Sequence, residues 1–312
     1  TDTEKYLAKV ILSTWNEKNN PPLSGKELNS ILKSAYSTSK KKKKDDSISV
    51  CSMIVGDTLY ESCYKPDRKR GKYYFSVYED GIVNESDGFV LDDQKYVPMR
   101  DPNGMVPNNV VLLPSNPTDY DSLEKLVSEI QSFIHKYVGI SETFEKISAF
   151  YVLLSWIFDC FNVIPYLRIK GEAGCGKSTF IRTVGSICYR PTFTAGATTA
   201  APIFRMIEKI QGTFVLDEAD FQNSDIHSQI VKILNCGYQV GLPVIRCDVA
   251  SKSMEPQFYK VYGPKIIATR EEWKDRALES RCLTEDMEGK YRPDLKLIVE
   301  KEFQKEACEL RN

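Results

Sequence analysis

The segment Tyr166–Phe180, YLRIKGEAGCGKSTF, has the residue types and the spacing that bind phosphate groups. Gly171, Gly176, Lys177 and Ser178 fit the pattern G-x-x-x-x-G-K-[ST] between an expected strand and an expected helix. Glycines let backbone amides face inward, the lysine reaches the β- and γ-phosphates, and the serine binds Mg²⁺. We therefore predict an ATP·Mg²⁺ site, with Cys175 as a loop filler. The residues expected to line this nucleotide site are Gly171, Glu172, Ala173, Gly174, Cys175, Gly176, Lys177, Ser178 and Thr179.

A pair of acidic residues lies forty residues beyond Lys177, in TFVLDEAD. We expect the strand Thr213–Leu216 to lie next to the strand of the phosphate loop, so that Asp217 binds Mg²⁺. Glu218 would then polarise the attacking water as a general base. An apolar run that ends in Asp-Glu is also common at ordinary strand ends, but this spacing favours a catalytic pair. The pair disfavours a small-molecule kinase, which needs no water-activating acid.

Two further polar positions follow the acid pair. Thr269 closes the apolar run in GPKIIATREEW, where it would orient the water at the γ-phosphate. The alternative is an ordinary threonine at a strand edge. Arg281 in DRALESRCL is expected to enter the site of a neighbouring subunit and stabilise the charge of the transition state, with Arg276 as the second choice. An isolated arginine on a helix is otherwise a surface charge.

This ordered set resembles the AAA+ ATPases over roughly residues 120–285. The resemblance implies an α/β fold, namely a P-loop NTPase with a parallel sheet flanked by helices. It also implies ATP hydrolysis at the interfaces of a ring. The residues expected to take part in catalysis are Lys177, Glu218, Thr269, Arg281 and Arg276.

A helix and a β-hairpin are expected between the acid pair and Thr269. Val244–Cys247 would be the outgoing strand, Ala250–Pro256 the tip and Phe258–Tyr262 the returning strand. This placement is similar to the pre-sensor-1 hairpin of the MCM and superfamily 3 helicases. The similarity implies that Lys252 at the tip contacts DNA, supported by Lys260 and Arg246; the alternative for Lys252 is an exposed loop lysine.

The flanking segments differ in character. Residues 1–40 are expected to be helical, with a capping box at Ser24 and Glu27. They resemble the short helical module that follows the primase-polymerase domain in phage and plasmid replication proteins, so we expect an excised fragment of a fused primase-helicase. Residues 48–115 are expected to form a small β-rich subdomain whose aromatic residues pack within the sheet rather than on bases. Residues 118–285 are the expected AAA+ domain, and residues 286–312 hold one C-terminal helix of a truncated lid, with no convincing sensor-2 arginine.

The composition limits the ways in which this chain could bind DNA, zinc or a membrane. The net charge is −1, so DNA contact requires a local basic surface, such as the lysines that a ring brings to one axis. Nine cysteines without a CxxC pair and only two histidines exclude the usual zinc spacings, and free thiols are expected. The window AFYVLLSWIFDCFNVI is too short and too interrupted to span a bilayer, so we expect a buried helix and no membrane contact. The expected location is the cytoplasm, that of the host if the source is viral.

The leading hypothesis is an ATP-driven DNA helicase or translocase for replication of a phage or plasmid-like element. It would act as a homo-oligomeric ring, expected to be a hexamer, with single-stranded DNA in its central pore. One alternative is a AAA+ helicase loader or protein-remodelling ATPase. Another is a binding module that holds nucleotide structurally, which the acid pair disfavours.

Overall fold

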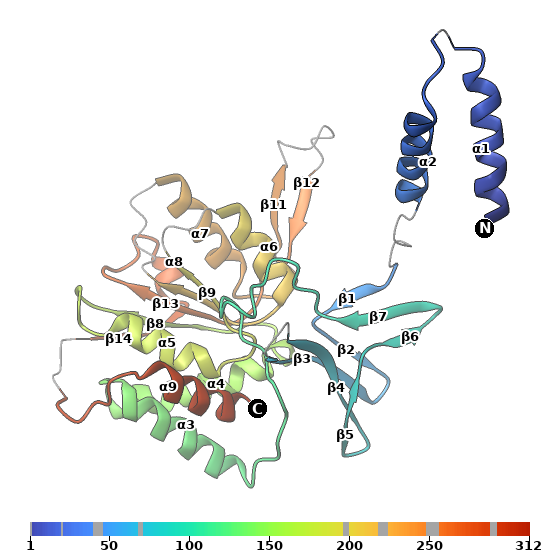
Figure 1. The fold of residues 1–312 in the computed structure, drawn as a ribbon. Coiled ribbons are helices and arrows are strands. Elements are labelled where there is room, and N and C mark those ends of the chain that lie inside the picture. Colours follow the sequence, from blue (N-terminus) through green and yellow to red (C-terminus); the bar gives the residue numbers. More distant parts are fainter. Residues whose placement is uncertain are drawn as a thin grey trace. The chain divides into compact units, whose positions relative to one another are not determined.

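The computed structural model describes residues 2–19, 21–39, 46–67, 71–195, 200–217, 224–247, 256–287 and 292–312 (Figure 1). The chain forms two compact units, residues 1–48 and 49–312. The first unit holds α1 (Asp2–Asn16) and α2 (Gly25–Ser39). The predicted capping box is confirmed, because the Ser24 amide donates to Glu27 Oε2 at 2.8 Å and the Glu27 amide donates to Ser24 Oγ at 3.4 Å.

The second unit begins with two small antiparallel groups of strands. Their bounds are β1 (Ile48–Val50), β2 (Ser52–Val55), β3 (Thr58–Lys65), β4 (Lys72–Glu79), β5 (Ile82–Ser86), β6 (Phe89–Leu91) and β7 (Gln94–Pro98). One sheet has the order β2-β3-β4-β5 and the other β1-β7-β6. Phe89 stacks between Tyr60 and Tyr96, with ring centroids 3.9 and 5.1 Å away. Tyr74 and Phe75 are buried, so the aromatic packing expected here is confirmed for these two residues.

The rest of the second unit alternates helices and strands around one sheet. Its bounds are α3 (Leu123–Tyr137), α4 (Glu142–Trp156), η1 (Phe158–Cys160), β8 (Tyr166–Lys170), α5 (Lys177–Ile187), β9 (Thr192–Ala195), α6 (Ala200–Ile210), β10 (Phe214–Asp217), α7 (Ser224–Cys236), β11 (Val244–Cys247), β12 (Pro256–Tyr259), β13 (Lys265–Thr269), α8 (Arg276–Glu279), β14 (Cys282–Asp286) and α9 (Glu300–Arg311). The five-stranded sheet has the order β14-β8-β13-β10-β9, and its four strand pairs are parallel. The predicted α/β class with a parallel sheet is confirmed.

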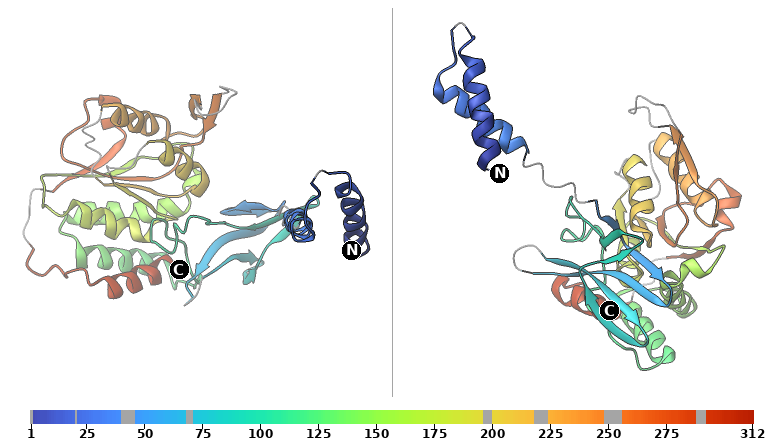
Figure 2. Two further views of the ribbon diagram at one scale, coloured as in Figure 1. Left: turned by 45° about the horizontal axis from the view of Figure 1, so that its top comes forward. Right: turned by 90° about the vertical axis from the view of Figure 1, so that its right-hand side faces the viewer.

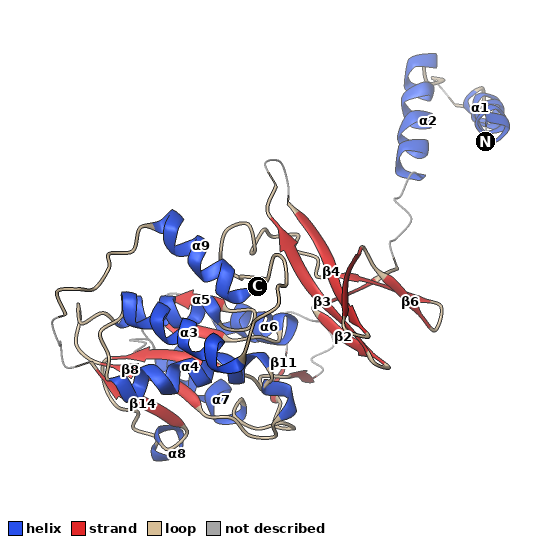
Figure 3. Ribbon diagram, turned by 90° about the horizontal axis from the view of Figure 1, so that it is seen from below, coloured by secondary structure: helices blue, strands red, loops and turns tan. Residues whose placement is uncertain are grey.

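Two apolar cores cover the two faces of this sheet. One core joins residues of α3, α4, α5 and α9 to alternate strand residues such as Leu167 and Val215 (Figure 3). The other joins residues of α6, α7 and α8 to the intervening residues, such as Tyr166 and Leu216. Strands that are covered on both faces are apolar almost throughout, which is why the strand runs were readable in the sequence.

The C-terminal helix α9 belongs to the first core. Phe303 and Ala307 are fully buried there, and Phe303 contacts the rings of Phe133 and Tyr137 of α3. The truncated lid proposed for residues 286–312 stays a prediction; the observed position of α9 is against α3 and α5.

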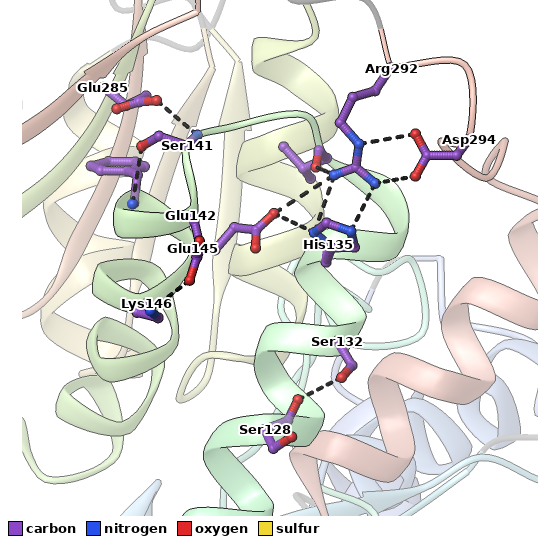
Figure 4. Close-up of polar contacts among 12 residues, drawn as sticks. Ser128, Ser132, His135, Ser141, Glu142, Glu145, Lys146, Glu285, Arg292 and Asp294 are labelled. Carbon is purple, nitrogen blue, oxygen red and sulfur yellow. Dashed lines mark hydrogen bonds and ion pairs between the residues drawn. The ribbon is translucent and has the colours of Figure 1, made fainter.

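A polar cluster ties the segment before α9 to the corner between α3 and α4 (Figure 4). Arg292 Nη2 donates to Asp294 Oδ2 at 2.6 Å and lies 3.1 Å from His135 Nε2. His135 Nδ1 lies 2.7 Å from Glu145 Oε1, and Glu145 is buried. Nearby, the Ser141 amide donates to Glu285 Oε1 at 3.0 Å. These contacts hold the end of β14 and the start of the C-terminal segment beside α4.

The long apolar window is helical only in part. Helix α4 ends at Trp156, so the expectation of one buried helix to Ile164 is wrong for its second half. Polar Asp159 and Asn162 lie there, after the helix. Within the described residues, no helix combines the length and apolarity needed to cross a bilayer. Cys51 and Cys63 are buried free thiols, and the other cysteines whose side chains are described, which exclude Cys247, are free as well.

Candidate active site

The phosphate loop lies between the end of β8 and the first turn of α5, where the sequence predicts it. Gly174 and Gly176 have φ values of 84° and 101°, a conformation that favours glycine. A Cβ on Gly171 would lie 2.8 Å from Cys175 Sγ and 2.9 Å from the Met287 carbonyl oxygen. Glycine is therefore required at position 171 by close contact with the chain that follows β14. Cys175 is half-buried inside the loop, as expected of a filler.

Lys177 is folded back onto the loop. Its Nζ donates to the carbonyl oxygens of Gly171 and Glu172 at 2.6 and 2.7 Å, and the residue is buried. A helix N-terminus and an ammonium group converge here, and both attract anions. The two carbonyl bonds are those that an incoming phosphate would replace.

The strand order corrects one expectation. The strand of Asp217 was expected beside the strand of the phosphate loop, but β13 lies between β8 and β10. The predicted strand Thr213–Leu216 is observed one residue later, at Phe214–Asp217. Because β8, β13 and β10 run parallel in register, Lys170, Thr269 and Asp217 still reach the same edge of the sheet.

Asp217 and Ser178 line one cavity of about 430 Å³, together with Arg182 of α5 and Glu300 of α9. Asp217 Oδ1 is buried and has no hydrogen-bond partner among the described residues. Val215 packs in the core of α5, and side chains alternate along a strand, so Asp217 points to the same face as α5. A carboxylate and a hydroxyl are the hard oxygen ligands that Mg²⁺ prefers. These two residues fit a magnesium ion that is otherwise held by phosphate and water.

Thr269 is the last residue of β13, which lies between β8 and β10 in the sheet. It is buried, and its Oγ1 has no hydrogen-bond partner among the described residues. Its carbonyl oxygen accepts from the Gly171 amide at 3.2 Å. Ile267 packs in the second core, so Thr269 points to the face opposite to that of Asp217. A buried hydroxyl without a partner costs free energy unless a ligand or water satisfies it.

A second cavity of about 550 Å³ opens along the phosphate loop. It is bounded by Gly171 to Cys175, and by Lys170, Arg270 and Met287. Lys170 Nζ lies 3.1 Å from both Asp286 Oδ2 and Glu272 Oε1, and these carboxylates raise the pKa of Lys170. Lys170 is therefore charged but already neutralised by two acids.

The two arginine candidates have different surroundings. Arg276 is exposed at the start of α8. Arg281 was expected on a helix, but it lies between α8 and β14 and is half-buried. Its guanidinium lies 4.0 Å from the ring centroid of Tyr238 and donates to Asn235 Oδ1. Within its own chain, Arg281 is thus held by α7 and the residues that follow it.

Arg168 is a buried charge next to the candidate site that we did not predict. It lies in the middle of β8 with 1% exposure and forms an ion pair with Glu279 of α8. Its Nε also donates to Thr284 Oγ1 at 3.0 Å. The phosphate-loop strand is therefore bonded to the segment that carries both arginine candidates. An isolated charge inside the apolar run YLRIK was the available signal in the sequence.

The predicted hairpin is confirmed, but its returning strand, β12, starts at Pro256 and ends at Tyr259, earlier than the expected Phe258–Tyr262. β11 and β12 form an antiparallel pair, drawn in orange in Figure 2. Ile245 lies opposite Phe258. Val244 and Tyr259 are buried against the domain, whereas Ile245 and Phe258 are 59% and 60% exposed. The hairpin therefore exposes an apolar pair that we did not predict.

The predicted DNA contacts are placed in part. The Arg246 guanidinium lies 4.7 Å from the ring centroid of Phe204 on α6. Lys260 is exposed directly after β12. Lys252, Glu218 and the hairpin tip lie outside the described residues, so their roles stay predictions.

Comparisons with solved structures give remote similarities. No protein-family model matches the chain, and no curated protein matches it. The A-form apo structure of the NrS-1 C-terminal region has a TM-score of 0.36 and 12% identity, over 81% of this chain and 64% of that one. The structure titled SCCmec type IV Cch, active helicase, has a TM-score of 0.37 and 12% identity, over 91% of this chain and 48% of that one. The chain thus spans less than two thirds of either, and scores this low carry no argument about its activity.

Proposed function

We propose that this chain is a Mg²⁺-dependent ATPase of the AAA+ type that assembles into a ring and moves on single-stranded DNA as a helicase. One observation supports the proposal most. The complete phosphate-loop motif opens α5, and Ser178 in its first turn shares a cavity with the unpartnered carboxylate of Asp217. This is the donor set that nucleotide hydrolysis with magnesium requires.

In this proposal each residue of the site has a separate role in ATP hydrolysis. Lys177 would exchange its two carbonyl partners for the phosphates, and Ser178 and Asp217 would hold magnesium. Magnesium supplies charge neutralisation at the phosphate oxygens when it is bound. Thr269 offers a hydroxyl at the strand edge, and Glu218 takes the proton of the attacking water. Arg281 or Arg276 would complete the pocket from the adjacent subunit.

In this proposal the β11–β12 hairpin region contacts the DNA. β11 of the hairpin carries Arg246, and Lys260 directly follows β12. In a ring of six copies, such side chains gather around one axis and give a basic channel to a chain of net charge −1. The fused primase-polymerase parent, the phage or plasmid-like element and the cytoplasmic location are part of the same proposal.

Phosphate release with and without single-stranded DNA tests this function. Lys177→Ala should abolish ATP binding and hydrolysis together, whereas Glu218→Gln should bind ATP without cutting it. Hydrolysis that DNA stimulates supports the helicase. Hydrolysis that DNA leaves unchanged favours the loader or remodelling ATPase, and tight binding without hydrolysis favours the structural nucleotide site.

A further inference from the structure

A cavity of about 390 Å³ lies at the base of the β11–β12 hairpin, away from the phosphate loop. Helix α6 contributes Phe204, helix α7 contributes Ser228, Gln229 and Lys232, and β11 contributes Ile245 and Arg246. Its volume is within the range of small-ligand pockets. No residue of the proposed ATP site lines it.

Two cations line this cavity, and neither has an acidic partner among the described residues. Neither Lys232 nor Arg246 pairs with a carboxylate of the described residues, and no carboxylate is among the cavity's lining residues. The Arg246 Cζ atom lies 4.7 Å from the centroid of the Phe204 ring, a cation–π contact that holds the guanidinium at the cavity. A guanidinium and an exposed ammonium group at one cavity favour an anionic ligand such as phosphate.

The same cavity has a neutral, directional part. Gln229 Oε1 is buried and has no hydrogen-bond partner among the described residues. Gln229 and Lys232 are three residues apart on α7, so their side chains lie on neighbouring positions of one helix face. Phe204 and Val244 add an apolar wall, and Val244 lies two residues from Arg246 on β11, so both side chains are on the same face of the strand. An amide acceptor, an apolar wall and two cations together match the base and the phosphate of a nucleotide unit.

We propose that this cavity binds one nucleotide unit of single-stranded DNA, with its phosphate between Lys232 and Arg246 and its base against Gln229 and the apolar wall. The inference rests on the proposed function and adds a binding site on α7 behind the hairpin. The DNA strand would then contact each subunit twice, once at the hairpin and once in this cavity.

The test is the salt dependence of binding to fluorescein-labelled oligo-dT, measured by fluorescence anisotropy. Each phosphate contact that is lost should lower the slope of log K against log salt by about 0.7. Lys232→Gln and Arg246→Gln should each show this loss, with several-fold weaker binding at low salt. Arg246→Lys should retain the slope. Lys305→Gln on α9, which removes an exposed lysine far along the chain, is the matched control and should bind like the wild type.

Gln229→Leu tests the contact with the base separately from the contact with the phosphate. The change removes a neutral acceptor, so it should weaken binding while leaving the salt slope unchanged. Wild-type affinity in this variant would overturn the assignment of the base.

The outcomes separate this inference from the proposed function. A wild-type protein that binds oligo-dT, with Lys232→Gln retaining the full slope, overturns the cavity alone. A wild-type protein that binds no oligo-dT overturns the helicase proposal and the cavity with it. Lys232 is exposed, and a thermal melt of Lys232→Gln that overlays the wild type confirms that the comparison is between folded proteins.

Discussion

Arg190 and Glu61 form a buried ion pair that joins the chain after α5 to strand β3. Arg190 Nε donates to Glu61 Oε1 at 2.8 Å, and Nη2 donates to Oε2 at 2.6 Å. The hydroxyl of Tyr189 donates to the same carboxylate at 3.0 Å. The Arg190 side chain is 1% exposed, and its φ of 40° is unusual for a residue other than glycine. The helix that begins at the phosphate loop is thus followed directly by the contact with the β-rich part.

Removing one charge of this pair should destabilise the protein strongly. Glu61→Gln leaves the Arg190 guanidinium buried without its counter-charge, which costs about 3–5 kcal/mol of unfolding free energy. Urea unfolding at pH 7 measures the loss. The matched control is Glu85→Gln, which removes the exposed partner of Lys65 and should cost less than about 1 kcal/mol. Equal losses in the two variants would contradict the importance of burial.

Thr269→Val should lower turnover more than binding. Valine keeps the shape of the side chain but removes the buried hydroxyl at the strand edge. If Thr269 orients the attacking water, kcat should fall by about a hundredfold with little change in KM, as for other lost single donors in active sites. Thr213→Val makes the same change in a buried threonine just before β10, at the opposite edge of the sheet. A similar loss of kcat in both variants would point to a structural effect.

Arg281 can be tested by mixing two inactive proteins. If arginine acts across subunits, Arg281→Ala mixed with Lys177→Ala forms some interfaces in which both residues are present, and ATP hydrolysis should partly recover. Arg281→Ala also loses its contact with the Tyr238 ring, so a control for that lost packing is needed. Tyr238→Leu alone should retain most of its turnover. No recovery at any mixing ratio would assign Arg281 to its own subunit, and the same mixture with Arg276→Ala would then be decisive.

Lys265 should make stability depend on pH. It is fully buried at the start of β13, and its Nζ donates to the carbonyl oxygens of Val261 and Gly263 at 2.8 and 2.9 Å. Burial lowers the pKa of Lys265 to about 7, below the value of 10.5 expected in the unfolded chain. The unfolded state therefore binds more protons between these values, so this lysine's contribution to the unfolding free energy rises as pH increases from about 7.

Lys265→Met removes that contribution. The difference in unfolding free energy between wild type and Lys265→Met should grow in favour of the wild type between pH 7 and pH 9, by up to about 1.4 kcal/mol per pH unit. Other groups titrate in both proteins and cancel in the difference. Lys305→Met, at an exposed position of α9, should show no such trend. A constant difference across the interval would mean that the carbonyl oxygens keep Lys265 charged.

Local features were predictable because they depend on neighbours in the chain. The positions of Gly176, Lys177 and Ser178 follow from a contiguous motif, and a strand and a helix flank it as expected. Val244–Cys247 was predicted to the residue, since the period of apolar side chains is visible within four residues. The capping box at Ser24 and Glu27 is likewise a contact between residues three apart.

Contacts between distant segments were not predictable in the same way. Asp217 was expected beside the phosphate-loop strand, yet β13 takes that place, because strand order depends on long connections and not on strand composition. The pairing of Arg281 with Tyr238, and of Arg190 with Glu61, joins residues that no periodicity relates.

By itself, the amino-acid sequence determined which residues form the phosphate loop and which runs become strands, because hydrogen bonds and side-chain alternation act over a few residues. Only the tertiary structure decided that Ser178 and Asp217 line one cavity and that Lys232 and Arg246 line another. These pairs meet because separate segments bury their apolar faces against a common sheet, and the free energy of that burial belongs to the whole domain.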